Sequence, residues 1–161
     1  MLSLNMGSAP GLAPLTDGFS QPYWDAAGDG TLLIQRCACC GRHQFYPRAH
    51  CAACFAPDPE WVPASGHGRL HTYTVIFRTP NAEFAADCPY VLGIVELDEG
   101  PRLTARILGE AGDLPDGLGC DARVHVVFTP RATGKAGTGK AATGDTATAA
   151  LSVLPNFVLE A

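Results

Sequence analysis

The C-terminal part of the chain repeats short, mainly apolar stretches that are separated by turn residues. Five such stretches follow Gly66: GRLHTYTVIFRTP, YVLGIVELD, PRLTARILG, ARVHVVFTP and LSVLPNFVLE. In the third, Leu103, Ala105 and Ile107 alternate with polar residues, as in a strand with one buried and one solvated face. Gly, Pro and acidic residues lie between the stretches. Five short strands with such turns predict a small closed or nearly closed β-barrel.

The first of these strands carries two aromatic residues. Tyr73 and Phe77 share a strand face with Val75, because side chains two positions apart point the same way. This placement predicts that both rings lie in the core. The alternative is that they stack on nucleotide bases, as rings on small barrels can.

The segment before the barrel predicts one short helix and one strand. Ser20 is placed to cap a helix over residues 22–27, residues 31–36 favour a strand, and residues 58–63 favour an extended bridge. The remaining residues suggest a division into a flexible leader, a unit with the helix and the clustered cysteines, and the barrel. These three parts span residues 1–18, 19–62 and 63–161.

Residues 131–150 contain almost only Ala, Gly, Thr and a few charges. They fall between the fourth and fifth predicted strands, so we expect a long hairpin loop that adds nothing to the core. An inert insertion is favoured over an arm that grasps a partner.

The composition is that of a globular protein. With 161 residues, 47% of them hydrophobic and 17% charged, the chain can bury a core, which excludes a disordered protein for most of its length. The first residues do not resemble a secretory signal, and no stretch has the roughly 18 apolar residues of a membrane span. We therefore expect a cytoplasmic protein without a membrane segment, in which thiols stay reduced.

The net charge is acidic, which disfavours nucleic acid as a partner. It is −5 for the whole chain, and −7 when residues 131–150 are left out. Such a surface repels a phosphate backbone overall, although a local basic patch can persist. Arg36, Arg42 and Arg48 lie around the cysteine cluster. They are candidates for binding the phosphates of CoA or of a nucleic acid, and equally for solvated surface charges.

The strongest motif is a pair of CxxC sequences separated by ten residues. It supplies the predicted zinc ligands, which are Cys37, Cys40, Cys51 and Cys54. Each CxxC places two thiolates on one tight turn, and two such turns facing each other complete a tetrahedral Zn²⁺ shell. Gly41 suits the bend after the first pair because it tolerates positive φ. Four protein ligands leave no position for water, so the site is predicted to be structural.

Alternatives to this zinc site remain. Iron in a rubredoxin-type site uses the same four thiolates and is the main competitor. Cys39 is expected to be a bystander, and His43 and His50 to be surface residues, because four cysteines already satisfy the metal. The other candidate groups have no partner at the spacing of a catalytic motif, which favours structural or surface roles. They are His67, His71, His125, Cys88 and Cys120.

The whole pattern resembles the DUF-thirty-five family of zinc-ribbon and OB-fold proteins. The resemblance runs from about Phe19 to Leu159, apart from residues 131–150. It rests on four segments: PYWDAAGDGTLLIQRCACCG, YPRAHCAAC, EWVPASGHGRLHTYTVIFRTP and CPYVLGIVELDEGPRLTARILG. It implies a mainly β protein, with an N-terminal helix and a rubredoxin-like four-cysteine zinc ribbon followed by a five-stranded OB-fold barrel.

The same resemblance implies a function. Members of the family resemble companions of thiolase-fold enzymes that act on acyl-CoA, in which the partner supplies the catalytic groups. The first hypothesis is therefore a non-catalytic accessory subunit that binds such an enzyme and helps to shape its complex or its CoA or acyl site. The alternative is a protein that binds single-stranded nucleic acid through its OB fold and ribbon arginines. A stand-alone enzyme is not expected, because no nucleophile and base are paired in the sequence.

Overall fold

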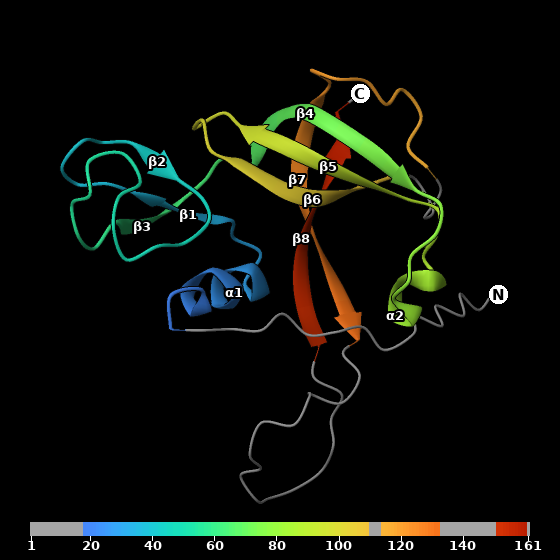
Figure 1. Cartoon of the computed structure of the whole chain (residues 1–161), viewed down its shortest axis with the longest axis horizontal. Helices are drawn as coiled ribbons and strands as arrows, with labels where there is room; N and C mark the ends of the chain where they lie inside the picture. Colours follow the sequence, from blue (N-terminus) through green and yellow to red (C-terminus); the bar gives the residue numbers. More distant parts are fainter. Residues whose placement is uncertain (1–17, 110–113, 133–150, 161) are drawn as a thin grey trace, which may run out of the picture.

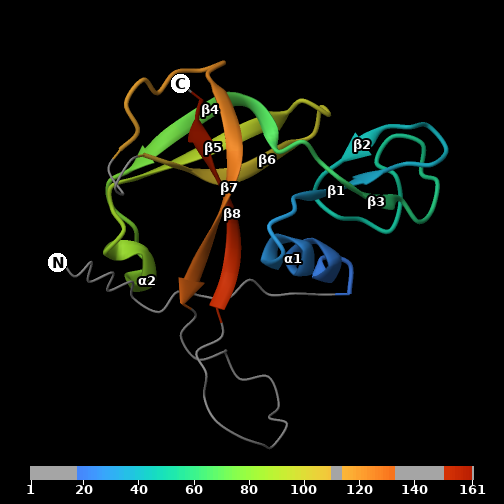
Figure 2. The ribbon, with the colours of Figure 1, turned by 180° about the vertical axis from the view of Figure 1, so that it is seen from behind.

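The computed structural model describes residues 18–109, 114–132 and 151–160. In this part of the chain a small sheet and a β-barrel lie side by side, with a helix below the junction (Figure 1). The view from behind shows the same arrangement (Figure 2). The predicted leader lies outside the described residues except for Gly18, and so does the predicted loop except for Arg131 and Ala132.

The barrel has the predicted five strands. They are β4 (His67–Ile76), β5 (Tyr90–Leu97), β6 (Arg102–Leu108), β7 (Arg123–Ala132) and β8 (Leu151–Leu159). They close in the order β4-β5-β6-β8-β7, with β6 and β8 parallel and every other pair antiparallel. The prediction of a small closed barrel is therefore confirmed. The predicted loop begins later than expected, because Arg131 and Ala132 pair with β8 as part of β7.

The N-terminal part forms a three-stranded sheet in the order β2-β1-β3. Its strands are β1 (Leu33–Arg36), β2 (His43–Gln44) and β3 (Glu60–Pro63). The predicted extended bridge over residues 58–63 is a paired strand over its last four residues. Glu60–Pro63 pair with β1, and Pro59 and Pro63 lie just before the strand and at its last residue.

Helix α1 (Gln21–Gly28) confirms the predicted helix. Ser20 occupies the N-cap position, but its side chain makes no capping hydrogen bond there. Tyr23 and Ala27, four residues apart, form the buried face. A second helix, α2 (Ala82–Ala85), was not predicted. No helix in the described part of the chain has the length and apolar character needed to cross a membrane.

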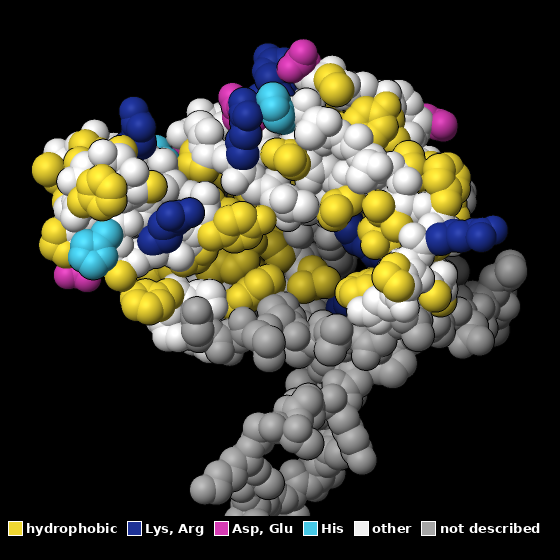
Figure 3. Space-filling model, viewed as in Figure 1, with side chains coloured by type: hydrophobic (Ala, Val, Ile, Leu, Met, Phe, Trp, Pro, Cys, Tyr) yellow, Lys and Arg dark blue, Asp and Glu magenta, His cyan; other side chains and the backbone are white. Residues whose placement is uncertain are grey.

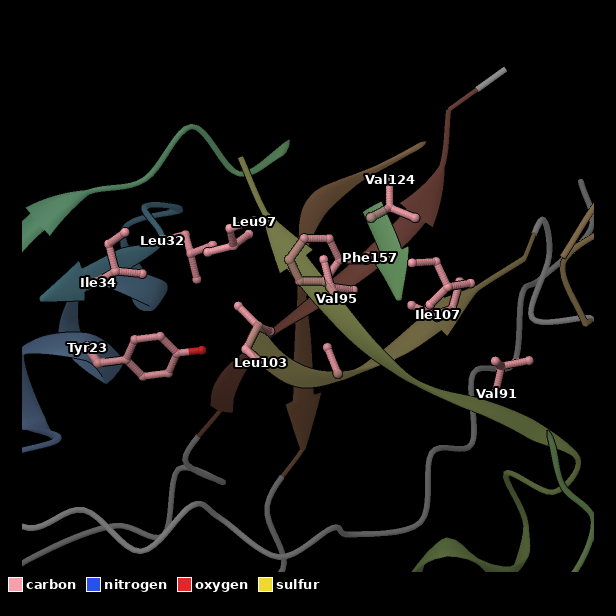
Figure 4. Packing of buried hydrophobic residues seen from close by; sticks show 12 residues of the cluster. Tyr23, Leu32, Ile34, Val91, Val95, Leu97, Leu103, Ile107, Val124 and Phe157 are labelled. Carbon is pink, nitrogen blue, oxygen red and sulfur yellow. The ribbon is translucent and has the colours of Figure 1, made fainter. Parts of the chain in front are cut away.

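One hydrophobic core joins the two halves of the structure. Tyr23 of α1 and Ile34 of β1 belong to the same buried cluster as Leu103 and Phe157 of the barrel (Figure 4). Ile34 and Phe157 are completely buried. The small sheet is therefore held against the barrel by shared packing, in addition to the covalent connection.

The predicted core positions of Tyr73 and Phe77 are wrong. Phe77 is 69% exposed and Tyr73 is 36% exposed. The strand register shifts between Leu70 and Thr72, and β4 pairs with β7 only over residues 67–69. The second half of β4 therefore extends past the closed part of the barrel. Val75 still packs against the core there, but the rings of Tyr73 and Phe77 are left uncovered.

Candidate metal centre and the adjoining groove

The four predicted ligand cysteines lie together at the tip of the small sheet. Their Sγ atoms are all within 4.8 Å of one another. Two of the sulfur pairs, Cys37 with Cys54 and Cys40 with Cys51, are 3.6 and 3.7 Å apart. A Zn–S bond of about 2.3 Å places the sulfurs of a tetrahedral site roughly 3.8 Å apart, so the spacing fits zinc. Each distance is far too long for a disulfide, and all seven cysteines are free.

Two similar turns position these sulfurs. In the first, the amide of Gly41 donates to the carbonyl of Cys37, and in the second the amide of Phe55 donates to the carbonyl of Cys51. Gly41 and Phe55 both have positive φ, of 70° and 60°. The glycine was predicted to serve this purpose. The phenylalanine was not, because a bulky residue rarely adopts this conformation.

Backbone amides stabilise the thiolate form in both turns. The amide of Cys54, with help from that of Ala53, lowers the pKa of the Cys51 thiol to about 6. The amide of Cys40 is the main cause that lowers the pKa of Cys37. Thiolates are the form that binds a metal. The amide of Ala56 also favours the Cys54 thiolate, but the neighbouring cysteine side chains outweigh it and raise the pKa of Cys54 to about 12. The backbone of the two turns therefore favours thiolates at Cys37 and Cys51.

A buried pair of glutamines braces the second turn. Gln44 donates through Nε2 to the side-chain oxygen of Gln35 at 2.9 Å and to the carbonyl of His50 at 3.3 Å. Its own oxygen accepts from the amide of Ala52 at 2.8 Å. Gln35 also accepts from the amide of Arg48 at 2.8 Å. Neither glutamine was predicted, because nothing in the sequence marks them as buried.

The other residues near the motif lie outside the cysteine cluster. Cys39 is exposed, as expected of a bystander. His50 is exposed and His43 is half-buried, and neither belongs to the group of metal-binding atoms found among the described residues. Arg36, Arg42 and Arg48 are all exposed. Arg42 borders a polar hollow beside the β5–β6 turn, so any phosphate contact would be made at the surface.

A hydrophobic groove of about 380 Å³ lies between α1, the segment after β2, and strands β5, β6 and β8. Figure 3 shows hydrophobic side chains gathered in this hollow, between the small sheet and the barrel. Six aromatic residues form much of its lining: Tyr23, Trp24, Phe45, Tyr46, Phe84 and Tyr90. Burial raises the pKa of Tyr23 far above its usual value, so its hydroxyl remains neutral.

Two arginines line the same groove, in contact with one carboxylate. Arg106 and Arg131 lie 3.0 and 3.1 Å from Oδ2 of Asp87. The guanidinium of Arg106 also stacks on Tyr90, 4.1 Å from the ring centre, and that of Arg131 lies 4.7 Å from the ring centre of Phe84. The groove therefore combines a large apolar surface with a fixed polar group at one side.

The described residues contain no arrangement typical of nucleophilic catalysis. In this part of the chain no histidine ring makes a hydrogen bond to a serine or cysteine side chain. The ring of His67 lies 2.7 Å from a carboxylate oxygen of Glu160, and the half-buried Cys88 donates to the carbonyl of Phe84. The site can therefore hold a metal and bind an apolar group, but it offers no paired nucleophile and base.

Two family models match the chain in succession. Residues 24–60 match the rubredoxin-like zinc ribbon domain of ChsH2, and residues 61–129 match its C-terminal OB-fold domain. Among solved structures, a chain of the Ltp2-ChsH2(DUF35) aldolase is similar with a TM-score of 0.68 and 27% identity. That similarity covers 91% of this chain and 98% of the other.

Three relatives illustrate the range of similar proteins. A "DUF35 domain-containing scaffold protein" of Methanothermobacter thermautotrophicus is 39% identical over 60% of this chain and 71% of its own length. A "Probable enoyl-CoA hydratase alpha subunit" of Thermomonospora curvata is 37% identical, but the match covers 56% of this chain and only 28% of that protein. The "Benzoylsuccinyl-CoA thiolase subunit BbsA" of Thauera aromatica is 29% identical over 67% of this chain and 72% of its own length.

Proposed function

Because the chain belongs to the ChsH2/DUF35 family of zinc-ribbon and OB-fold proteins, we propose that it is a non-catalytic accessory subunit of a thiolase-fold acyl-CoA enzyme. The observation that carries this proposal is the likeness to the Ltp2-ChsH2(DUF35) aldolase chain over 98% of that chain's length. The similarity to the BbsA thiolase subunits of two organisms supports it. A cytoplasmic location and a hetero-oligomeric state are parts of the same proposal.

Within this proposal, Cys37, Cys40, Cys51 and Cys54 hold one structural zinc ion. The spacing of the sulfurs and the amides that favour thiolates support these ligands. The ion would tie the two turns together and keep the small sheet folded beside the barrel. The division at residues 62 and 63 is supported by the two family models, which meet at residues 60 and 61. Metal analysis of purified protein distinguishes zinc from iron at this site.

The hydrophobic groove is the surface that we assign to the enzyme or to its acyl group. Large apolar hollows at a protein surface commonly mark sites for partner proteins or ligands. Tyr46, at the rim, is 54% exposed. The groove lies at the junction of the small sheet and the barrel, so both parts contribute to one binding surface.

Co-expression with a thiolase-fold subunit tests the proposal. We expect the two chains to copurify, and turnover of the acyl thioester to require both of them. Tyr46→Ala should weaken the complex, because it removes an aromatic ring from the groove. Phe55→Ala is the matched control, since Phe55 is an exposed ring of the same N-terminal unit, 77% accessible, that does not line the groove. A thiolase that is fully active alone and does not bind this chain contradicts the proposal.

A further inference from the structure

One edge of the second half of β4, which we call the free edge, has no strand partner in the described part of the chain. Strand β4 pairs with β7 over residues 67–69 only, and Leu70 then bonds to residues 121 and 122 of the following loop. From Thr72 to Ile76 the strand pairs with β5 in an unbroken register, and no described strand pairs with its other edge. Figures 1 and 2 show this end of β4 beyond the closed part of the barrel. Alternate residues on this edge therefore direct N–H and C=O groups away from β5.

The side chains of this segment are unusually exposed for a barrel strand. Exposed and buried residues alternate from His67 to Leu70, but the next four residues are all exposed. The loop at residues 114–122 therefore does not cover them. Tyr73 and Phe77 lie on one face of the segment, and together with Leu114 they are half of the large apolar residues that are exposed in the described chain. The edge thus offers apolar contacts beside its backbone groups.

The free edge of β4 also lacks the usual protection against strand addition. Edge strands are commonly protected by proline or by charged side chains. Strand β7 has such protection: past His125 it pairs only with β8, and this part contains Pro130 and Arg131. The corresponding part of β4, Thr72-Tyr73-Thr74-Val75-Ile76, has neither a proline nor a charge. Its residues are instead strong strand formers.

We propose that the free edge of β4 at Thr72–Ile76 receives an extended strand of the partner enzyme subunit. The added strand would run along β4, bond to its outward N–H and C=O groups, and place apolar side chains against Tyr73 and Phe77. This inference rests on the proposed function, because the partner is the enzyme subunit of that proposal. It concerns a different surface from the groove, so the two can be tested separately.

Hydrogen exchange in the complex gives a direct test. Outward-facing amides of residues 72–76 should exchange about tenfold more slowly, or slower still, once the thiolase-fold subunit binds, because each gains a strand partner. A complex that forms without protecting these amides overturns the inference but leaves the proposed function standing. Failure to form any complex overturns both. Protection that rises with the concentration of the isolated chain indicates a second copy as the occupant, and also overturns the inference.

A charged edge provides the second test. The double variant Thr72→Lys and Thr74→Lys changes two exposed side chains and should weaken binding of the partner by about tenfold or more, because lysines on an edge prevent strand addition. The control adds the same charge at exposed residues of α1 that do not line the groove, as Gln21→Lys with Gly28→Lys. Zinc content and melting temperature verify that both variants fold. Equal losses in both variants, or none in the first, contradict the inference.

Discussion

The cysteine cluster concentrates a large part of the local stability in four side chains. Cys37 and Cys51 are buried, while Cys40 and Cys54 are exposed, so the surrounding core is thin. Binding of zinc to such small modules contributes about 10–16 kcal/mol at neutral pH. Packing around the cluster cannot replace a contribution of that size. The fold of the turns should therefore depend on each of the four thiolates.

The first prediction is that Cys51→Ser abolishes tight zinc binding and unfolds the ribbon. A serine hydroxyl is a poor zinc ligand, and Cys51 is 2% exposed, with backbone bonds to Ala56 and Phe55 that define the second turn. Metal analysis and thermal unfolding measure the effect. Cys39→Ser is the control, because Cys39 is an exposed cysteine of the same motif outside the cluster. One equivalent of zinc and an unchanged melting curve in Cys51→Ser would sink the assignment.

The second prediction concerns the glutamine that supports the ligands. Gln44→Leu removes three hydrogen bonds. The amide of Ala52 loses its acceptor, and the side-chain oxygen of Gln35 loses one of its donors. The expected cost is about 1–3 kcal/mol, since these groups are buried or partly buried. Gln44→Leu should therefore lose zinc to a competing chelator faster than the unaltered protein does.

The control for Gln44→Leu is Gln21→Leu. Gln21 is an exposed helix residue whose amide donates to Asp25 at 2.7 Å, so the same change of side chain occurs far from the metal. Equal rates of zinc transfer in both variants and the unaltered protein contradict a supporting role for Gln44.

The sequence predicted the cluster of four cysteines because CxxC spacing is specific. It did not predict this support, since the two glutamines meet only after β1 and β2 pair.

Strands β4, β5 and β6 depend on a close approach at a single glycine. A Cβ atom at Gly93 of β5 would lie 2.7 Å from Leu70 and 2.9 Å from Ile107. Both neighbours are buried core residues, so they have little room to move. The inner face of β5 is therefore built around the absence of a side chain at this position.

The third prediction is that Gly93→Ala destabilises the barrel by about 1–3 kcal/mol, because the added methyl group overpacks the core. Thermal or denaturant unfolding measures the loss. Gly28→Ala is the matched control, since Gly28 ends α1 with open space around the position of a Cβ. That variant should be neutral, or more stable by about 0.4–1 kcal/mol. Similar melting temperatures for the two variants contradict this account of the packing.

The elements that the sequence predicted are those with a clear pattern. Strands β6 and β7 alternate in polarity, and the other barrel strands are short apolar stretches between turn residues. Helix α1 has a proline in its first turn and buries two residues one turn apart. The missed elements have no such signal: β2 has two residues and α2 has four. Tyr73 and Phe77 were misplaced for another reason. The period gave their shared face correctly, but it carries no information on where the barrel closure ends.

On the scale of the molecule, the functional surfaces arise where distant parts meet. The groove combines residues of both helices, the segment after β2 and four barrel strands, so no local motif could predict it. A cluster of charged side chains also brings distant residues together. It consists of His67, Asp98, Arg123 and Glu160, and we call it the C-terminal clasp. Glu160 binds His67, and Arg123 forms two hydrogen bonds to Asp98 at 2.7 and 2.9 Å. The clasp links the last described residue to the first residue of β4.

The last prediction is that the clasp contributes stability at neutral pH that is lost in acid. The hydrogen bond from Arg123 is the main cause that lowers the pKa of Asp98, and the hydrogen bond from His67 is the main cause that lowers that of Glu160. Since both pKa values are lower in the folded state, this stability is complete above the ordinary values of 3.8 and 4.5. It disappears as the pH falls through the lowered values.

Asp98→Asn tests the clasp when unfolding is followed at a series of pH values. The variant should melt below the unaltered protein at neutral pH, and the difference should shrink toward zero below the ordinary pKa of Asp98. Acid also protonates the cysteine thiolates, but this affects both proteins equally, so the difference between them isolates the clasp. Asp116→Asn, at an exposed loop position, is the control and should show no such difference. If the gap between Asp98→Asn and the unaltered protein is the same at every pH, the carboxylate does not stabilise the barrel through its charge.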